Sequence, residues 1–227
     1  MTIAGGRGER LKPYTDTVAK AMTPINGRPI LEYQVLWMRS QGITDVVFLT
    51  GYLAETVRTH FGDGSAFGIR AHYSHEDQPL GRGGAIRKGL SLVPDNEEVV
   101  LISNGDTLTN LDLSLLLYIH EKRHATATLM LARHPSQFGI VHMGEDDLVE
   151  EFAEKQSLPL WINAGVYLFD PKIKGLLPES GDHEVSTFPF LANEKKLAAL
   201  PSEAMWLTID SAKDLREASD ILKHWTN

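Results

Sequence analysis

Glycine and arginine residues are concentrated in one short stretch near the start of the chain. Gly5-Gly6-Arg7-Gly8-Glu9-Arg10 follows a short apolar run, and Lys20 adds a further cation downstream. Glycine tolerates positive φ and lets the backbone approach a ligand, and successive N–H groups in such a turn converge on phosphate oxygens. The charges of Arg7 and Arg10 favour the same anion. The stretch therefore predicts a cradle for the phosphates of a nucleoside triphosphate.

The same glycine cluster is also compatible with a plain strand-to-helix turn. It is not a Walker A loop, because no Gly-Lys-Ser/Thr follows. It is a poor dinucleotide fingerprint as well, because the third glycine of that pattern is missing and Arg10 lies nearby instead. The loop alone leaves both interpretations open, so residues further along the chain must decide.

Two aspartates follow predicted strands at distant points of the chain. Asn104-Gly105-Asp106 comes directly after a buried strand, and Asp210 comes after the strand-like run 206–209. Ligands of open parallel sheets bind beyond the carboxyl ends of the strands, and Mg²⁺ prefers a few carboxylates together with phosphate oxygens and water. The pattern predicts one Mg²⁺ shared by Asp106 and Asp210. The alternatives are a plain Gly-Asp turn and, for Asp210, a favourable position before a helix.

Polar residues also interrupt two strands of the second half. Glu154-Lys155 pairs an acceptor for hydroxyl groups with a point charge for a phosphate, although an exposed ion pair on an edge strand would look the same. Asn163-Ala164-Gly165 breaks an apolar strand, which indicates either a bulge or the close approach of a ligand. The nine histidines have no metal-ligand spacing, and we find no nucleophilic triad.

The composition narrows the class of protein. The chain has 227 residues, 42% of them hydrophobic, and 22 Lys+Arg against 30 Asp+Glu give a net charge of −8, which argues against nucleic acid or an anionic membrane as partner. The absence of cysteine excludes disulfides and thiolate metal sites and fits a reducing cytoplasm. With no apolar run of membrane-spanning length and no signal peptide before the loop, we expect a cytoplasmic protein. The opening strand is short, which leaves open a natural start upstream of Met1.

Strands and helices alternate in the first half of the chain. The apolar patterns predict strands at 2–4, 45–50, 69–73 and 99–102, and helices at 28–41, 53–61 and 85–92. The run at 45–50 is continuously apolar, as in a strand covered on both faces. This alternation implies right-handed crossovers and an α/β fold with a mostly parallel central sheet flanked by helices.

The second half has shorter strands separated by turns. We expect a helix at 113–122, strands at 126–131, 139–142, 148–152 and 162–169, and an acidic turn at 145–147. These strands predict mixed or antiparallel additions to the sheet. Ser211 and Asp214 form a capping pair for a last helix, whose buried face would be Leu215, Ala218, Ile221, Leu222 and Trp225. We see no repeat or linker, so 1–227 is expected to be a single domain.

Taken together, the motifs resemble the sugar-1-phosphate nucleotidyltransferases, in that family's order and over almost the whole chain. The motifs that carry the resemblance are Ala4 to Leu11 with Lys20, Asn104-Gly105-Asp106, Phe138-Gly139-Ile140, Glu154-Lys155, Asn163-Ala164-Gly165-Val166-Tyr167 and Trp206 to Asp210. The short length and the segment 79–86 look most like mannose- or heptose-1-phosphate guanylyltransferases, and also like small uridylyltransferases.

The resemblance implies a Rossmann-like, GT-A-like sheet in which 1–110 mainly binds the nucleotide and 111–227 mainly binds the sugar phosphate. Its catalytic residues would be Arg10, Lys20 and Asp106, with Asp106 and Asp210 on Mg²⁺. The nucleotide would contact Ala4, Gly5, Gly6, Arg7, Gly8, Gln78, Leu80, Gly81, Gly83, Asn104 and Gly105. The sugar phosphate would contact Gly139, Glu154, Lys155 and Asn163.

The resemblance also implies a reaction. A nucleoside monophosphate would pass from a nucleoside triphosphate to a sugar 1-phosphate, releasing pyrophosphate and giving a nucleotide sugar for cell-surface polysaccharide. We expect GTP with D-mannose 1-phosphate or D-glycero-D-manno-heptose 1-phosphate. The alternatives are uridylyl or thymidylyl transfer to glucose or N-acetylmuramic acid 1-phosphate, and a non-catalytic regulatory relative. The expected partners are small molecules, with no nucleic acid and no membrane, and a homodimer is left open.

Three positions depart from the family pattern. Ala19 precedes the lysine and Gln156 follows Glu154-Lys155, where the family usually has proline at both positions. Arg82 occupies the base-facing loop where the family commonly has threonine. The departures at Ala19 and Gln156 are compatible with the expected chemistry, whereas Arg82 leaves the selection of the base open.

Overall fold

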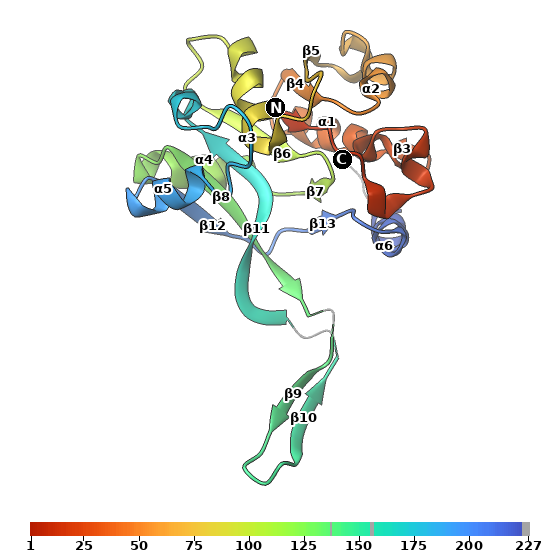
Figure 1. Ribbon diagram of the computed structural model, residues 1–227, viewed down its shortest axis with the longest axis vertical. Helices are drawn as coiled ribbons and strands as arrows, with labels where there is room; N and C mark the ends of the chain where they lie inside the picture. The colour runs from red at the N-terminus through yellow and green to blue at the C-terminus, as the bar shows by residue number, and fades with distance from the viewer. Residues whose placement is uncertain (137, 155–156, 224–227) are drawn as a thin grey trace.

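A seven-stranded sheet with the strand order β12-β8-β11-β6-β1-β4-β5 runs through the computed structural model, which describes residues 1–136, 138–154 and 157–223 (Figure 1). Its strands are β1 (Thr2–Ile3), β4 (Asp45–Thr50), β5 (Arg70–His75), β6 (Val100–Asn104), β8 (Ala127–Pro135), β11 (Ser157–Phe169) and β12 (Leu197–Pro201). The pairings β6-β1, β1-β4, β4-β5 and β12-β8 are parallel, and β11 is antiparallel to both of its neighbours. The predicted α/β fold, a mostly parallel sheet with an antiparallel addition from the second half, is confirmed.

Helices and short hairpins complete the fold. The α-helices are α1 (Ile30–Ser40), α2 (Ala54–Phe61), α3 (Gly81–Gly89), α4 (Leu113–Arg123), α5 (Thr187–Asn193) and α6 (Ala212–Leu222). The two-stranded sheets are β2 (Pro24–Ile25) with β3 (Arg28–Pro29), β7 (Thr107–Thr109) with β13 (Trp206–Thr208), and β9 (Ile140–Met143) with β10 (Val149–Ala153). Single 3₁₀ turns span Glu9–Leu11, Tyr14–Asp16, Lys20–Met22, Ser65–Phe67, Leu90–Leu92 and Pro171–Gly175.

Alternate residues of β4 enter two different hydrophobic clusters. Val46 and Phe48 pack with apolar side chains of α1, α2 and α4, whereas Val47 and Leu49 pack with those of α3 and α5. Successive side chains of a strand point to opposite faces, so helices cover this strand on both sides. The prediction from its continuous apolar run is therefore confirmed.

The sequence-based boundaries differ from the structure in a few places. The first predicted helix begins later, at Ile30, because Arg28–Pro29 pairs with Pro24–Ile25 as a hairpin. The strand β12 and the helix α5 were not predicted. The last helix has the predicted capping box, but Ile221 is 46% exposed and lies outside the buried face, and Trp225 lies outside the described residues.

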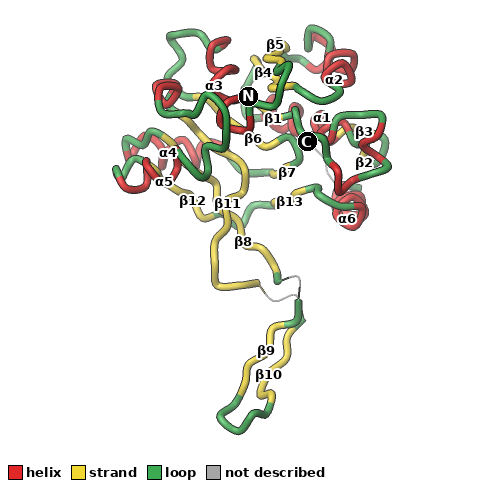
Figure 2. The backbone as a smooth tube through the Cα atoms, in the orientation of Figure 1, coloured by secondary structure: helices red, strands yellow, loops and turns green. Residues whose placement is uncertain are grey.

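The hairpin β9-β10 extends away from the rest of the molecule, beyond the ends of β8 and β11 (Figures 1 and 2). Its six acidic residues are Glu145, Asp146, Asp147, Glu150, Glu151 and Glu154. Several of its apolar side chains are exposed, including Met143, Val149 and Phe152. This position separates the hairpin from the carboxyl end of the parallel strands.

Among the helices of the described residues, none combines the length and the apolar character that crossing a bilayer requires.

Candidate active site

A charged chamber of about 350 Å³ opens at the carboxyl ends of β1 and β6. Its lining residues are Ile3, Ala4, Gly6, Gly8, Glu9, Arg10, Lys20, Ala21, Arg82, Asn104, Gly105, Asp106 and Asp210. The chamber therefore brings together the glycine loop, the lysine and both strand-end aspartates, which come from three distant parts of the sequence. Its volume falls within the usual range for small-molecule sites.

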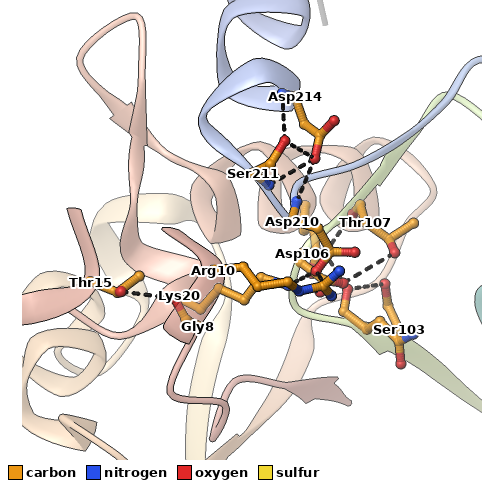
Figure 3. A network of polar contacts seen from close by, with 12 residues as sticks. Gly8, Arg10, Thr15, Lys20, Ser103, Asp106, Thr107, Asp210, Ser211 and Asp214 are labelled. Carbon is orange, nitrogen blue, oxygen red and sulfur yellow. Dashed lines mark hydrogen bonds and ion pairs between the residues drawn. The ribbon is translucent and has the colours of Figure 1, made fainter. Parts of the chain in front are cut away.

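Lys20 lies between the two aspartates. Its Nζ is 2.5 Å from Oδ2 of Asp106 and 2.6 Å from Oδ1 of Asp210, and Arg10 Nη2 lies 2.9 Å from the same Asp210 oxygen (Figure 3). The side chain of Lys20 is 16% exposed, whereas that of Arg10 is 76% exposed. The carboxylates of Asp106 and Asp210 thus converge on the ammonium group of Lys20 at the chamber wall, and the exposed guanidinium of Arg10 lies at the rim.

The pKa of Lys20 reflects this arrangement. Burial by itself would lower the pKa of Lys20, but the charges and hydrogen bonds of Asp106 and Asp210 outweigh it and raise that pKa above its ordinary value. The ammonium group therefore stays charged at neutral pH.

Gln34 of α1 braces the loop that carries Asp106. Its Nε2 donates to the carbonyl oxygens of Asn104 at 2.6 Å and Thr107 at 2.5 Å, and its Oε1 accepts from Thr2 Oγ1 at 2.9 Å. The side chain is buried, so these bonds cross the core and tie β1 to both sides of the Asp106 turn. Sequence reasoning missed Gln34, whose only signal was a glutamine among the apolar residues of a helix.

The start of α6 positions Asp210. Asp214 Oδ2 accepts hydrogen bonds from the backbone N–H groups of Asp210 at 3.0 Å and Ser211 at 2.7 Å (Figure 3). The capping box therefore satisfies the helix terminus without the Asp210 carboxylate, which turns to Lys20 and Arg10 instead. Of the two interpretations for Asp210, the structure favours a place in the charged chamber over a helix cap.

A second chamber of about 560 Å³ adjoins the first and shares Ile3, Gly6 and Arg82 with it. Its other lining residues are Gly5, Arg7, Leu49, Gly51, Tyr52, His75, Glu76, Asp77, Pro79, Gly81 and Ala85. Glu76 accepts a hydrogen bond from Leu80 N at 3.0 Å, and a Cβ added to Gly5 would lie 2.9 Å from Glu76 Oε1. Sequence reasoning missed Glu76, which lies between Gly5 and the loop that begins at Leu80.

The predicted interruption at Asn163-Ala164-Gly165 is a bulge. The register of β11 against β8 shifts between Asn163 and Tyr167, and Gly165 has φ +74°. A Cβ on Gly165 would lie 2.4 Å from Asn104 Nδ2, so only glycine allows β11 to pass this close to the chamber wall. Trp206 Nε1 donates to Ala164 O at 2.8 Å, which joins the bulge to the strand that precedes Asp210.

Arg82 is held by two carboxylates that the sequence did not single out. Its Nε lies 2.9 Å from Asp182 Oδ2, its Nη2 also contacts that oxygen, and its Nη1 lies 2.6 Å from Glu184 Oε1. Asp182, His183 and Glu184 offer ligand atoms within 4.8 Å of one another. The guanidinium already pairs with both carboxylates, so this cluster holds a side-chain cation.

Some predicted residues lie outside both chambers. Gln78 is exposed and lines neither of them. Gly83 is buried in the packing of α3, where a Cβ would lie 2.7 Å from Pro178 and 2.9 Å from His183 N, and Leu80 contributes its backbone N–H to Glu76. The glycines of this loop thus serve close packing against 178–183, which the sequence could not reveal.

Two predicted sugar-phosphate residues lie at the hairpin. Gly139 packs against the Phe152 ring, where a Cβ would come within 2.5 Å, and Glu154 is an exposed residue directly after β10. Neither lines the charged chamber in this arrangement, because β8 and β11 carry the hairpin away from it (Figure 1). Lys155 lies outside the described residues.

Known proteins are similar to this chain in sequence and in fold. The chain is 32% identical to a mannose-1-phosphate guanylyltransferase of Mycobacterium tuberculosis, over 98% of this chain and 64% of that protein. It is 27% identical to a UTP–glucose-1-phosphate uridylyltransferase of Synechocystis, over 96% and 61%, and 30% identical to a mannose-1-phosphate guanylyltransferase catalytic subunit beta of Danio rerio, over 94% and 61%. The chain spans about three fifths of the length of these curated relatives.

Two solved structures have the same fold. A putative glucose-1-phosphate thymidylyltransferase from Bacillus anthracis superposes with a TM-score of 0.79 at 20% identity, covering 100% of this chain and 95% of that one. HddC from Yersinia pseudotuberculosis superposes with a TM-score of 0.76 at 22% identity, covering 97% of each chain. The family model described as nucleotidyl transferase matches residues 1–224. The chain belongs to the nucleotidyl transferase family.

Proposed function

We propose that this protein transfers a nucleoside monophosphate from a nucleoside triphosphate to a sugar 1-phosphate, giving a nucleotide sugar and pyrophosphate. The observation that carries this proposal is the convergence of Asp106, Asp210 and Arg10 on Lys20 in one chamber of a nucleotidyl transferase family member. The activities for which the relatives are named, guanylyl and uridylyl transfer to hexose 1-phosphates, support it.

In this proposal the two chambers divide the donor nucleotide between them. The triphosphate lies along Ala4 to Gly8 in the charged chamber, near Asn104 and Gly105, and the base enters the second chamber. Gly8 has φ +63°, and a Cβ there would lie 2.9 Å from Thr15 and 3.0 Å from Lys20, so glycine keeps the loop close to the lysine. The guanidinium carbon of Arg7 lies 5.4 Å from the centre of the Tyr52 ring, and both side chains line the second chamber.

Mg²⁺ fits the donor set of the charged chamber. Asp106 and Asp210 present oxygens that converge on a single cation, here the Lys20 ammonium, and carboxylates with phosphate oxygens are the ligands that Mg²⁺ prefers. Asp106 and Asp210 would hold the ion. When bound, Mg²⁺ would neutralise charge on the phosphates of the donor.

The residues of this site suit a reaction that needs no general base. A sugar 1-phosphate is largely dianionic near neutral pH, since the second pKa of a phosphate monoester is about 6. Its phosphate oxygen attacks the α-phosphorus, the bond from that phosphorus to the bridging oxygen breaks, and pyrophosphate leaves with the electron pair. Lys20 and Arg10 would offset the repulsion between the two anions and stabilise the charge of the leaving group.

For the donor and acceptor we propose GTP with D-mannose 1-phosphate or D-glycero-D-manno-heptose 1-phosphate. The relatives named as mannose-1-phosphate guanylyltransferases support this choice. The half-buried carboxylate of Glu76 in the second chamber supports it as well, because guanine presents N–H donors to such an acceptor. The uridylyltransferase among the relatives keeps UTP or dTTP with another sugar 1-phosphate as the second candidate.

For the acceptor we propose Asn163 as the described residue that contacts the sugar. The bulge that contains it brings Gly165, two residues further on, against Asn104 of the charged chamber. Gly139 and Glu154 would reach the same acceptor only if the hairpin folded back toward the sheet. The net charge of −8 supports small molecules rather than nucleic acid as the partners, and the absence of cysteine supports a cytoplasmic location.

Pyrophosphate release tests the proposal directly. Five nucleoside triphosphates are combined with mannose, glucose, heptose and muramic acid 1-phosphates in the presence of Mg²⁺. The expected result is release with GTP and mannose or heptose 1-phosphate, and its loss in the Asp106→Asn variant, which assigns the activity to this chain. Activity confined to UTP or dTTP would show that the proposed substrates are wrong and that the proposed type of reaction is right. Binding of a nucleotide without release from any pair would support a regulatory protein instead.

A further inference from the structure

Arg82 starts a chain of polar contacts that runs from the nucleotide chambers to Asn163. Arg82 lines both chambers, and its Nη1 lies 2.6 Å from Glu184 Oε1. The same Glu184 oxygen accepts a hydrogen bond from Tyr167 Oη at 3.0 Å. Asn163 Nδ2 in turn donates to Tyr167 Oη at 3.0 Å. The four side chains form one continuous path between the two halves of the proposed active site.

The chemistry of Glu184 sets the direction of every bond in this path. A carboxylate paired with a guanidinium only accepts hydrogen bonds, so the Tyr167 hydroxyl must donate its single proton to Glu184. The hydroxyl oxygen is then left as an acceptor and requires a donor from Asn163. Tyr167 is buried, and burial raises the pKa of its hydroxyl, which keeps that proton in place.

The direction of these bonds fixes the side-chain amide of Asn163. One N–H of its Nδ2 points to Tyr167, and its Oδ1 accepts from Gly165 N at 3.1 Å. Rotating the amide by half a turn would bring an oxygen against the Tyr167 oxygen and an N–H against the Gly165 N–H. Because both contacts would then be lost, one amide orientation is strongly favoured. In that orientation the second N–H of Nδ2 has no partner among the described residues, which leaves it to serve a ligand.

We propose that Arg82 is a positioning residue for the acceptor: acting through Glu184 and Tyr167, it orients the Asn163 amide to donate a hydrogen bond to a hydroxyl oxygen of the sugar. This inference rests on the proposed function for the identity of the ligand. It gives a role to the arginine that stands where the family commonly has threonine. It also explains why two carboxylates outside both chambers hold the guanidinium.

Tyr167→Phe is the sharpest test, because it removes only the hydroxyl and leaves every residue that lines the chambers. The ring packs among Phe169, His183 and Phe188, so phenylalanine keeps the aromatic contacts. We expect the KM for the sugar 1-phosphate to rise about tenfold, while the KM for the nucleoside triphosphate changes by less than about twofold. Arg82→Gln should raise the same KM, and Arg82→Lys should restore part of it.

Arg87→Gln is the matched control. Arg87 lies on the same helix and reaches the same segment, at Leu177 O and Glu179. In the part of the chain that the structure describes, it makes no hydrogen bond or ion pair with the path to Asn163. Its KM values should equal those of the wild type. If Tyr167→Phe leaves the sugar KM unchanged, or raises both KM values equally with a fall in melting temperature, the positioning role is wrong.

A second measurement tests the inference without any turnover. In protein with ¹⁵N-labelled asparagine, the Nδ2 protons of Asn163 should exchange slowly with water in the wild type and in Arg87→Gln. They should exchange at least about tenfold faster in Tyr167→Phe and in Arg82→Gln. Equal exchange in all four proteins would overturn the inference, whatever the substrates prove to be. The absence of pyrophosphate release from the wild type would instead count against the proposed function alone.

Discussion

Lys20 and Asp210 are separated by 190 positions in the sequence, yet Nζ of the lysine lies 2.6 Å from Oδ1 of the aspartate. The same nitrogen lies 2.5 Å from Oδ2 of Asp106. Three segments of the chain therefore meet at one ammonium group, where the proposed reaction would bring two phosphorylated substrates together.

Replacing Lys20 by methionine should separate catalysis from metal affinity. Turnover should fall by about 10²-fold or more, because a cation next to the reacting phosphates is lost. The affinity for Mn²⁺ in the absence of nucleotide should rise about tenfold, since Asp106 and Asp210 would lose the ammonium group between them and only Arg10 would still pair with Asp210. Mn²⁺ binding is measured by electron paramagnetic resonance and turnover by pyrophosphate release. Lys213→Met, an exposed lysine of α6, is the control, and unchanged Mn²⁺ affinity in Lys20→Met would contradict the shared site.

Asp106→Asn and Asp210→Asn should each make the enzyme more dependent on Mg²⁺. We expect turnover to fall by about 10² to 10³-fold and the Mg²⁺ concentration at half-maximal rate to rise, because one anionic ligand is removed. Chelation should stop the wild-type reaction, and added Mg²⁺ should restore it. The exposed carboxylate of Asp95 provides a control variant, Asp95→Asn. If both site variants depend on Mg²⁺ as the wild type does, Asp106 and Asp210 do not bind the metal ion.

Gln34→Met should weaken the enzyme from inside the core. The substitution keeps the length of the side chain but removes its hydrogen bonds to Thr2 Oγ1 and to the carbonyl oxygens of Asn104 and Thr107. The free energy of unfolding should decrease by about 2 to 4 kcal/mol, because buried polar groups lose their partners. Turnover should fall as well, since the Asp106 turn is no longer braced. Urea unfolding followed by circular dichroism gives the first quantity, and a stability equal to the wild type would show that Gln34 is not a brace.

Gly165→Ala should be far more harmful than Gly175→Ala. Gly165 has φ +74°, and its new Cβ would lie 2.4 Å from Asn104 Nδ2, whereas nothing lies within 4 Å of a Cβ on Gly175. We expect a loss of about 1 to 3 kcal/mol in unfolding free energy for the first and little change for the second. Because Asn104 lines the charged chamber, nucleotide binding measured by calorimetry should weaken only in Gly165→Ala. Equal behaviour of the two variants would mean that the bulge is not tightly packed.

His183 should make the protein less stable in acid. Burial lowers the pKa of His183 from its ordinary value of 6.5 to about 4, so the folded state favours the neutral ring. The unfolded chain takes up the proton first, and stability is therefore full above about pH 6.5 and decreases by up to about 3 kcal/mol as the pH falls toward 4. Neither ring nitrogen has a hydrogen-bond partner among the described residues.

His183→Leu should flatten this dependence. The leucine fits the apolar surroundings of Tyr167, Phe169 and Phe188 and has no group to protonate. Unfolding free energies of the two proteins are compared between about pH 4 and pH 7. Parallel curves would show that another group, and not His183, controls the acid range.

Local patterns in the sequence determined much of this protein. The apolar run of β4, the alternation of the first half and the capping box of α6 each depend on neighbouring residues, and all three agree with the structure. The glycine loop with Lys20, Asp106 and Asp210 could also be placed at one sheet edge, because the ends of parallel strands meet there. The choice between a place in the charged chamber and a place at the helix terminus for the Asp210 carboxylate needed the Asp214 contacts.

Only the tertiary structure decided how the distant polar groups pair. The sequence around Arg82 does not show that Asp182 and Glu184 bind its guanidinium. In the same way, the sequence around Gln34 does not show that this side chain braces the Asp106 turn. Both sets of contacts join residues that are far apart in the chain. The direction of the β9-β10 hairpin, which keeps Gly139 and Glu154 away from the charged chamber, was hidden for the same reason (Figure 2). Local patterns fix which elements form, whereas the packing of those elements fixes which side chains meet.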